Sequence, residues 1–540
     1  MARLTLAHSR RRAGPNRSNA SRAGAVLVAL SVVLGAVVLR AGVATTTRAA
    51  ERTDVRILVQ GPSTFDPAAQ SDVATAAITA QLYETLTAYD AARQLQPALA
   101  ASWEVSSDGL HVTFHLRPGL AFSDGTQLSG QDVVGSWLRL LDPAHPSPLV
   151  ALLIDVRGAR AYVSGQSSDP SSVGLRANGL DVGVELERPG ADFPAIVSAP
   201  IFAVVPPAAW RDGQSAFGIG GVVSGGYSVT AVTGAEITLQ GNPHYWAGPP
   251  AIFTVHLILD IGGRSPVAAF EAGDLDYAPV SLIDAPWVAY DPDLGPQLRS
   301  APTLSLTYLG IDTTKPPFDD LRVRQALGAA IDWERVTSLG AFGGQVPAHA
   351  MVPPGIPGAG GASWWPVHDP AKARQLLADA GYPGGSGLPP IFFAAGGSGI
   401  GEAIAADLER ELGMHVELDV IGDSLSRLNT DPTNLWLTGW IADYVGPNDF
   451  LGVLLESDSS DNYGHWSSSA FDRAIAEALG TRDAAGAQAA YERAQAEVQR
   501  EVPVVPLYVG TEYALSRDGL LGAGDNGLGI LRMAGLAWAP

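Results

Sequence analysis

Residues 400–420 read IGEAIAADLERELGMHVELDV, and this stretch decides the fold class. Its apolar residues recur every three or four positions up to Leu412, which predicts one face of a helix that ends at Gly413. From Val416 to Val420 apolar and polar residues alternate, which predicts a strand. A helix followed directly by a strand is typical of α/β proteins.

Helices with clear start and stop signals precede this stretch. Asp369 is a suitable N-cap and Pro370 a suitable first residue for a helix that Gly381 ends. Asp320 opens a further helix, predicted over residues 321–331. Helices that alternate with strands in this way predict a mostly parallel sheet with helices packed on it.

The early part of the chain carries a hairpin signal. An Asp108-Gly109 turn leads into residues 110–116, where apolar residues occupy every second position. Capping boxes are predicted at the start of two helices, Ser129 with Asp132 and Ser469 with Asp472. At 540 residues the chain is too long for a single core, so two or three lobes are expected.

The composition is that of a globular protein, with 46% hydrophobic and 16% charged residues. The net charge is −21, and because residues 1–50 hold eight Arg and no acidic residue, the remainder carries −29. So acidic a body would repel a phosphate backbone, which argues against nucleic acid as a partner. The same field would attract a cationic ligand.

The N-terminus has the order of a secretory signal. Five arginines between Arg10 and Arg22 precede an uncharged apolar run over 23–39, and small residues follow around 41–50. Residues 1–50 are therefore predicted to be a signal peptide or, if uncleaved, an N-terminal anchor. The chain has no cysteine, which excludes disulfides and a lipoprotein anchored through an N-terminal Cys.

Motifs of common catalytic sites are missing from the sequence. It contains no Gly-x-Ser-x-Gly elbow, no His-Glu-x-x-His zinc helix and no phosphate-binding Gly-Lys-Ser/Thr, and its ten His are scattered. We therefore expect no catalytic residues, no metal site, no cofactor and no enzymatic activity.

One segment points to ligand binding. Residues 436–444, WLTGWIADY, begin as an apolar, aromatic strand and then place one carboxylate, Asp443, before a Gly-Pro turn. At the end of a sheet strand, where α/β folds place ligand sites, Asp443 could pair with a ligand ammonium group. The alternative for the same residue is a helix cap or turn at the end of a buried strand.

Short motifs from about residue 55 to about 515 follow the order of a known family. They occupy residues 64–67, 99–103, 114–117, 122–126, 136–140, 225–227, 242–246, 273–276, 315–332, 439–444 and 469–472. Through them the chain resembles the peptide/nickel-type (family 5) extracytoplasmic solute-binding proteins of ABC importers, and within these the oligopeptide-binding branch.

The resemblance implies an α/β fold of the periplasmic-binding-protein-like type II, with two lobes joined by a hinge and an inserted third domain (cluster C type). The implied parts are residues 51–75, 200–300 and 505–540 for lobe I, 76–199 for the inserted domain and 301–504 for lobe II. The ligand would bind between the lobes, which close by hinge bending.

The function that the resemblance implies is capture of short peptides and their delivery to an ABC permease with its ATPase subunits. Main-chain groups of both lobes would pair with the peptide as with an extra strand. The protein would be a monomer, exported to the periplasm or the cell exterior, at the outer face of the cytoplasmic membrane. It would touch the membrane only through permease docking or an uncleaved N-terminal anchor.

The resemblance also implies ligand-binding residues. Asp443 matches the carboxylate that holds the peptide α-amino group. Gly439, Trp440 and Ile441 match the strand that offers backbone groups and an aromatic wall, and Tyr308 matches an aromatic residue that lines the cleft. At the other end of the peptide the pattern differs, since Leu437 stands where the oligopeptide-binding branch has an Arg that receives the C-terminus. Nearby Arg427 is a candidate substitute.

Two other functions stay open. The same fold could hold another solute, chiefly an oligosaccharide stacked on aromatic faces, for which the candidates are Trp364, Trp365, Trp436, Trp440 and Trp466. The chain could also be an envelope regulator without a transport role, which the change at Leu437 and the missing lipid-bearing Cys allow.

Overall fold

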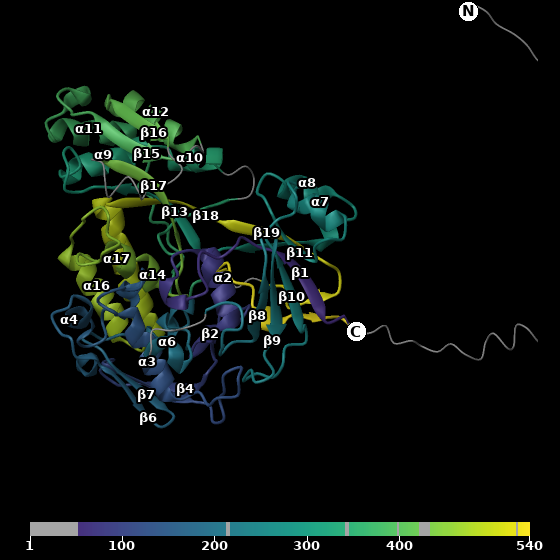
Figure 1. Cartoon of the computed structure of the whole chain (residues 1–540). Helices are drawn as coiled ribbons and strands as arrows, with labels where there is room; N and C mark the ends of the chain where they lie inside the picture. Colours follow the sequence, from purple (N-terminus) through teal and green to yellow (C-terminus); the bar gives the residue numbers. More distant parts are fainter. Residues whose placement is uncertain (1–51, 212–216, 341–344, 397–398, 421–432, 525–526) are drawn as a thin grey trace, which may run out of the picture. The chain divides into compact units, whose positions relative to one another are not determined.

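The computed structural model describes residues 52–211, 217–340, 345–396, 399–420, 433–524 and 527–540. Three larger β-sheets organise the compact unit over residues 53–540 (Figure 1). The predicted signal or anchor at residues 1–50 and the candidate Arg427 lie outside the described residues. Those predictions therefore stay predictions.

The first sheet has seven strands in the order β12-β19-β11-β1-β10-β9-β8. They are β1 (Asp54–Leu58), β8 (Tyr227–Val232), β9 (Glu236–Gly241), β10 (Thr254–Ile258), β11 (Tyr277–Val280), β12 (Leu298–Pro302) and β19 (Thr511–Ser516). Helix α2 (Val73–Leu82) adds Ile78 and Leu82 to its core. Helices α7 (Pro266–Glu271) and α8 (Ala285–Tyr290) form a second core with β11 and β19.

The second sheet has six strands in the order β14-β18-β13-β17-β15-β16. They are β13 (Ser305–Ile311), β14 (Val346–Pro347), β15 (Ile391–Ala395), β16 (Val416–Val420), β17 (Leu435–Ile441) and β18 (Val504–Val509). Helices α9 (Leu321–Ala330), α11 (Pro370–Asp379) and α12 (Ile400–Leu412) cover one face. Helices α16 (Ser469–Gly480) and α17 (Ala484–Glu501) pack on the other.

The third sheet has four antiparallel strands in the order β4-β5-β7-β6. They are β4 (Ala100–Val105), β5 (His111–Leu116), β6 (Leu175–Asn178) and β7 (Asp181–Glu185). Helix α3 (Gly130–Leu140) packs on this sheet through Trp137, which is fully buried and donates its indole N–H to the carbonyl of Phe202 at 2.9 Å.

The local sequence signals predicted the elements well. The hairpin β4–β5, the capping box of Ser129 with Asp132 and the start of α11 after Asp369 are confirmed. Helix α12 ends as predicted, at Gly413 with a left-handed φ of 63°. The second capping box is wrong by one residue, because Ser468 is the N-cap of α16.

The prediction of a mostly parallel sheet is wrong. Only β1 with β10 and β11, and β15 with β16 and β17, pair in parallel within the two large sheets. The other strand pairs are antiparallel. Some of them are hairpins, and the others involve the strands that lead from one large sheet into the other. Sequence periodicity reports which residues are buried and carries no information on strand direction.

Two short segments connect the large sheets. Thr303 and Leu304 join β12 to β13, and Gly510 joins β18 to β19. The N–H of Thr303 donates to the carbonyl of Gly510 at 3.0 Å. A Cβ at position 510 would lie 2.6 Å from Oγ1 of Thr303, so the two segments can lie this close only with glycine there.

These connections refine the predicted domain boundaries. We propose Gly510 rather than residue 505 as the point of return to lobe I, because β18 pairs within the six-stranded sheet. The predicted start of the inserted domain at 76 falls inside α2, whose core lies with the seven-stranded sheet, so we propose a later start. The other boundaries stay predictions.

Candidate functional site

Strand β17 has an open edge over its second half. Strand β13 pairs with it from Leu435 to Ile441, whereas β15 pairs only opposite its first two residues. The N–H of Ala442 donates to the carbonyl of Leu304, so the backbone groups of Ala442 face the β13 side. Successive residues of a strand direct their N–H and C=O groups to opposite sides. Gly439 and Ile441 therefore direct theirs away from β13. On that side no described strand pairs with them.

The two faces of β17 have different surroundings. Leu437 lies opposite Leu309 and belongs to the core under α9, α11 and α12, with 8% of its surface exposed. Tyr308 and Trp440 belong to the other face, which α16 and α17 cover. The residue that departs from the family pattern is therefore a core residue in this structure.

Asp443 follows β17 in the turn that leads to α14 (Pro447–Phe450). Its carboxylate has no hydrogen bond or ion pair with any residue that the structure describes. Asp449 at the start of α14 organises this turn, because its Oδ2 accepts from the indole Nε1 of Trp440 at 3.0 Å and from the backbone N–H of Asp443 at 3.3 Å. Asp449 is fully buried, and its Oδ1 has no partner.

Burial sets the electrostatics of this turn. It raises the pKa of Asp443 to about 7, and the negative charge of Asp461 adds to the effect. Burial and the nearby Asp443 also raise the pKa of Asp449 well above its usual range. A ligand ammonium beside Asp443 would lower its pKa again, because an opposite charge favours the ionised form.

Tyr308 and Tyr463 lie near the same charges. The hydroxyl of Tyr463 donates to Oδ1 of Asp461 at 3.2 Å. Burial raises the pKa of the Tyr308 hydroxyl, with smaller contributions from Tyr463 and Asp461. Only 4% of Tyr308 is exposed, so its contact with a ligand stays a prediction.

Most of the candidate sugar-stacking tryptophans have structural roles. Trp436 and Trp466 are buried, and the indole of Trp466 donates to Oε2 of Glu501 at 2.7 Å. The indole of Trp365 donates to the carbonyl of Pro506 at 2.8 Å. With Trp440 bound to Asp449, four of the five rings take part in packing or hydrogen bonds of the six-stranded sheet region.

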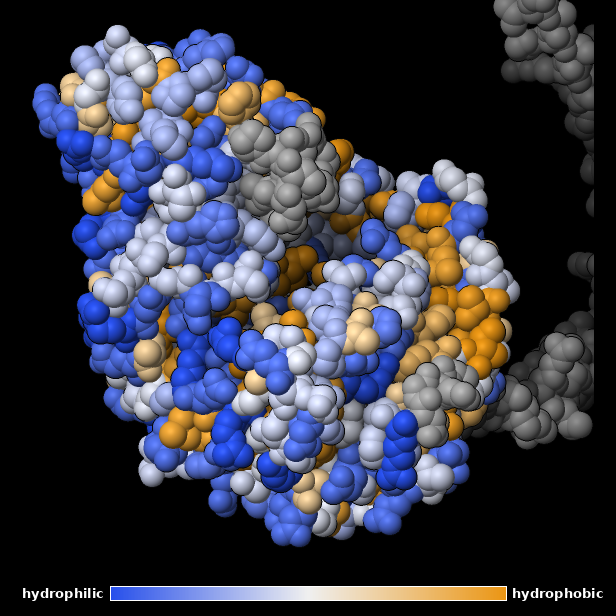
Figure 2. Space-filling model, turned by 60° about the vertical axis from the view of Figure 1, so that its left-hand side comes forward, coloured by the Kyte–Doolittle hydropathy of each residue, from blue (hydrophilic) through white to orange (hydrophobic). Residues whose placement is uncertain are grey.

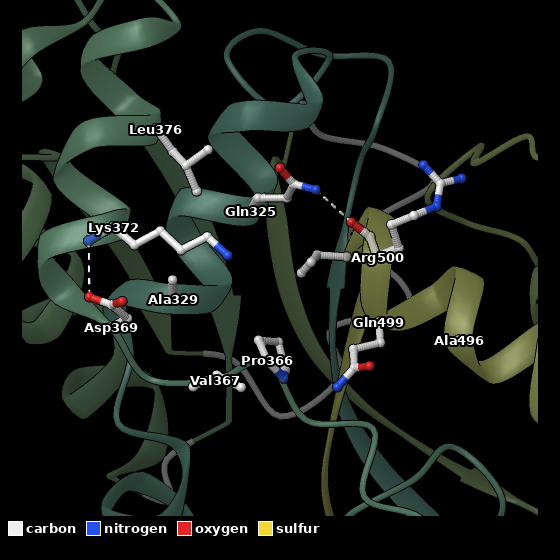
Figure 3. Close-up of a pocket in the computed structure, with 11 residues that line it drawn as sticks. Gln325, Ala329, Pro366, Val367, Asp369, Lys372, Leu376, Ala496, Gln499 and Arg500 are labelled. Carbon is white, nitrogen blue, oxygen red and sulfur yellow. Dashed lines mark hydrogen bonds between the residues drawn. The ribbon is translucent and has the colours of Figure 1, made fainter.

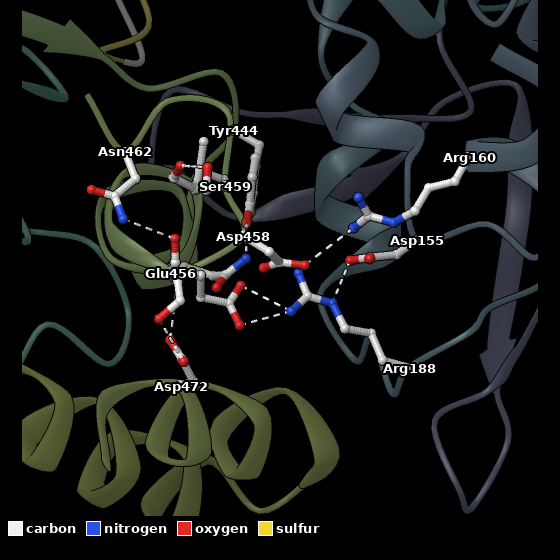
Figure 4. A network of polar contacts seen from close by, with 12 residues as sticks. Asp155, Arg160, Arg188, Tyr444, Glu456, Asp458, Ser459, Asn462 and Asp472 are labelled. Carbon is white, nitrogen blue, oxygen red and sulfur yellow. Dashed lines mark hydrogen bonds and ion pairs between the residues drawn. The ribbon is translucent and has the colours of Figure 1, made fainter. Parts of the chain in front are cut away.

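A network of ion pairs lies beside the turn (Figure 4). Arg188 bridges Asp155 at 2.6 Å and Glu456 at 2.7 Å, and Arg160 reaches Asp458 at 3.4 Å. The contacts join the part of the chain around the four-stranded sheet to the segment that follows β17.

Two further hydrogen bonds fix the residues directly after Asp443. The hydroxyl of Tyr444 donates to Oδ2 of Asp192 at 2.9 Å, and that of Tyr89 donates to the carbonyl of Val445 at 3.0 Å. The two residues that follow Asp443 are thus tied to the part of the chain that contains Tyr89 and Asp192.

None of the described cavities is lined by Asp443. One of about 530 Å³ lies between α9, α11 and α17 (Figure 3), where Gln325 donates to the carbonyl of Arg500 at 2.8 Å. Another of about 280 Å³ adjoins the Arg188 network and Tyr444. The space-filling view shows a hollow with apolar side chains inside and polar ones around it, as is usual for solute sites (Figure 2). Among the described residues no three His, Asp or Glu side chains are grouped to hold a metal ion.

Sequence reasoning named Asp443 and missed Asp449 and Asp461. Both acids become part of the site only through the fold, although one signal for them is in the sequence. Residues 428–472 contain seven acidic residues and no Lys or Arg, so Asp443, Asp449 and Asp461, in the interior of this stretch, have no cation close to them along the chain.

Comparison with known proteins gives consistent results. The sequence model of one protein family, described as bacterial extracellular solute-binding proteins, family 5 Middle, matches residues 94–462. The periplasmic oligopeptide-binding protein OppA of Escherichia coli K12 is 30% identical over 505 residues, covering 90% of this chain and 92% of the relative. The probable deoxycholate-binding periplasmic protein YgiS of the same strain is 30% identical over 465 residues, covering 83% and 86%. Among solved structures, the murein tripeptide binding protein MppA of Escherichia coli has a TM-score of 0.76 at 25% identity, covering 91% of this chain and 99% of that one.

Proposed function

The chain belongs to the family 5 bacterial extracellular solute-binding proteins, and from this premise we propose that it captures short peptides outside the cell for an ABC importer. Two similar proteins are named as a periplasmic oligopeptide-binding protein and a periplasmic murein peptide-binding protein. The observation that carries the proposal is the partly buried Asp443 carboxylate, without a described cation, directly beyond the open edge of β17.

The geometry supports a peptide backbone as the ligand. Gly439 and Ile441 offer N–H and C=O groups at an open strand edge, which a peptide main chain can extend as an additional strand. Asp443, two residues further, would receive the α-ammonium group. Such recognition relies on main-chain groups and one charge, so it would tolerate many side chains.

The same site argues against anionic solutes. One relative is named as a probable deoxycholate-binding protein, and deoxycholate carries a carboxylate. In this chain the described site residues near Asp443 are acidic or neutral, and a second negative charge would be repelled there. We therefore favour ligands with an ammonium group.

Delivery would need no chemistry on the ligand. We propose a monomer that closes by bending at Thr303–Leu304 and Gly510, the two connections between the large sheets, and docks on an ABC permease served by its ATPase subunits. Relatives are named as periplasmic proteins, and we propose the same export for this chain. Within the described residues no helix has the length and hydrophobicity needed to span a bilayer.

Isothermal titration calorimetry with tri-alanine and N-acetyl-tri-alanine tests the proposal. We expect acetylation to weaken binding about 100-fold, because it removes the charge that pairs with a buried carboxylate. Asp443→Asn should weaken tri-alanine binding by a similar factor and leave the acetylated peptide unaffected. Equal affinities for the two peptides would contradict the role of Asp443.

A second peptide pair tests the strand edge. N-methylation of a peptide bond removes one main-chain donor and keeps the ammonium group. We expect at least one methylated position in tri-alanine to weaken binding about tenfold, since a hydrogen bond partner at β17 is then lost. Binding that is indifferent to methylation at every position would exclude strand addition.

A further inference from the structure

Two tyrosines are exchanged between the predicted inserted domain and lobe II. Tyr444 of lobe II is fully buried in a hydrophobic core whose other described members all lie between residues 86 and 204, mainly in the predicted inserted domain. Tyr89 makes the opposite crossing, because the other buried members of its core lie between residues 304 and 509. Each of the two parts therefore holds a side chain of the other in its interior.

Both tyrosines donate to a polar group on the opposite side of this interface. The hydroxyl of Tyr444 donates to Oδ2 of Asp192 at 2.9 Å. The hydroxyl of Tyr89 donates to the backbone carbonyl of Val445 at 3.0 Å. A buried hydroxyl without a partner would cost free energy, so each bond favours one position of its ring in the other core.

The exchange takes place at the turn that carries Asp443. The N–H of Asp443 donates to Asp449, the side chain of Tyr444 reaches into the inserted domain, and the carbonyl of Val445 accepts from Tyr89. Three consecutive residues are thus each held by a hydrogen bond. Because planar peptide bonds leave only two soft dihedral angles per residue, the fixed residues after Asp443 restrict the direction in which its side chain leaves the backbone.

Other contacts attach the same two parts of the chain to each other further from the turn. Arg188 pairs with Glu456 at 2.7 Å (Figure 4). Arg160 pairs with Asp458 at 3.4 Å. These ion pairs hold the inserted domain against lobe II without a contact to Asp443 or the residue after it. The two tyrosines differ from them because their bonds lie on the turn itself.

We propose that Tyr89 and Tyr444 are positioning residues of the ligand site, through which the inserted domain sets the direction of the Asp443 carboxylate toward a ligand ammonium group. The ligand group itself is that of the proposed function, on which this inference rests. Neither tyrosine has to touch the ligand, since both act through the backbone of the turn. The inserted domain thereby contributes to ligand affinity from outside the contact surface.

Calorimetry with tri-alanine and N-acetyl-tri-alanine measures this role, because the ratio of the two Kd values reports the contact with Asp443. Tyr89→Phe and Tyr444→Phe each remove one hydroxyl and keep the ring. We expect each variant to reduce the ratio about threefold and the double variant to reduce it about tenfold, as one and two hydrogen bonds are lost. The affinity for the acetylated peptide should stay unchanged.

Two tyrosines of lobe I serve as matched controls. The hydroxyl of Tyr227 donates to a backbone carbonyl at 2.8 Å, as that of Tyr89 does. The hydroxyl of Tyr245 donates to a carboxylate oxygen of Glu84 at 2.6 Å, in the same manner as Tyr444. Tyr227→Phe and Tyr245→Phe should lower the melting temperature to a similar degree as the site variants and leave the ratio of the Kd values intact.

Hydrogen exchange of the ligand-free protein tests the positioning without any peptide. The amide of Asp443 donates to Asp449, so its protection reports the order of the turn. We expect amides of residues 442–446 to exchange about tenfold faster in the Tyr89→Phe/Tyr444→Phe variant and at the wild-type rate in the two controls. Faster exchange to the same extent along the whole chain would show a general loss of stability and would contradict a local role.

The outcomes separate this inference from the proposed function. If wild type prefers tri-alanine and the double variant keeps the full preference, the protein is a peptide binder and the inference about the two tyrosines is wrong. If the lobe I controls reduce the ratio as much as the site variants do, the inference is again wrong. If wild type binds neither peptide, the proposed function is overturned, and an unchanged exchange rate at residues 442–446 in the double variant overturns the inference as well.

Discussion

The Arg188 network and the turn at Asp443 are neighbours in the structure and differ in how their carboxylates are neutralised. In the network, Arg188 lies between Asp155 and Glu456 and neutralises both (Figure 4). In the turn, Asp443 is partly buried and Asp449 fully buried, and neither has a described cation beside it. Burial of an unpaired charge costs free energy, so a site that keeps one is a candidate for completion by a ligand.

The largest expected effect comes from breaking the neutralised group. Arg188→Met removes the cation and leaves the largely buried Glu456 without its partner. We expect the free energy of unfolding to fall by about 2 kcal/mol, less than for a fully buried pair because about a third of the Arg188 side chain is exposed. Urea denaturation measures this change. The double variant with Glu456→Gln should recover part of the loss, and no recovery would show that the pair is not the cause.

The opposite sign is expected at the turn. Asp443→Asn removes a buried charge that lacks a partner, and we expect it to stabilise the ligand-free protein by about 1 kcal/mol at about pH 8. The folded protein holds the Asp443 proton more tightly than the unfolded chain does, since its pKa rises from 3.8 to about 7. The destabilisation by this group therefore sets in as the pH rises through this range, and the gain of the variant should vanish near pH 4. A variant less stable than wild type at both pH values would contradict the assignment.

The smallest effect is expected for Asp449→Asn. Burial raises the pKa of Asp449 well above its usual range and so favours the neutral acid. Asn is also neutral, has nearly the same shape and can still accept from Trp440 through its side-chain oxygen. Asp449→Asn should change the free energy of unfolding at neutral pH by less than about 0.5 kcal/mol, whereas Asp449→Leu should cost about 1–3 kcal/mol through two lost hydrogen bonds. Equal losses for both variants would show that Asp449 is ionised in the fold.

The turn at Asp443 also shows which features of the site could be predicted from the sequence. Asp443 was identifiable because an apolar strand ends there, and helix caps such as Asp369 are local signals. The partnership of Asp449 with Trp440, and the core position of Leu437, depend on which face of the sheet each side chain takes and on helices far along the chain. Strand direction failed as a prediction for the same reason, because Gly510 and Thr303 bring distant strands together.

The central claim is that Asp443 is a partly buried carboxylate without a cation, and that the ammonium group of a ligand pairs with it. The pH dependence of peptide affinity tests this claim most directly. Tri-alanine binds as an ammonium at about pH 5–7, so only the protein titrates in this range. Because binding requires ionised Asp443, we expect affinity measured by calorimetry to fall about tenfold for each pH unit below about 7, with proton release on binding. The Asp443→Asn variant should show weak binding without this slope. An affinity of the wild-type protein that stays constant from about pH 7 to about pH 5 would contradict the account.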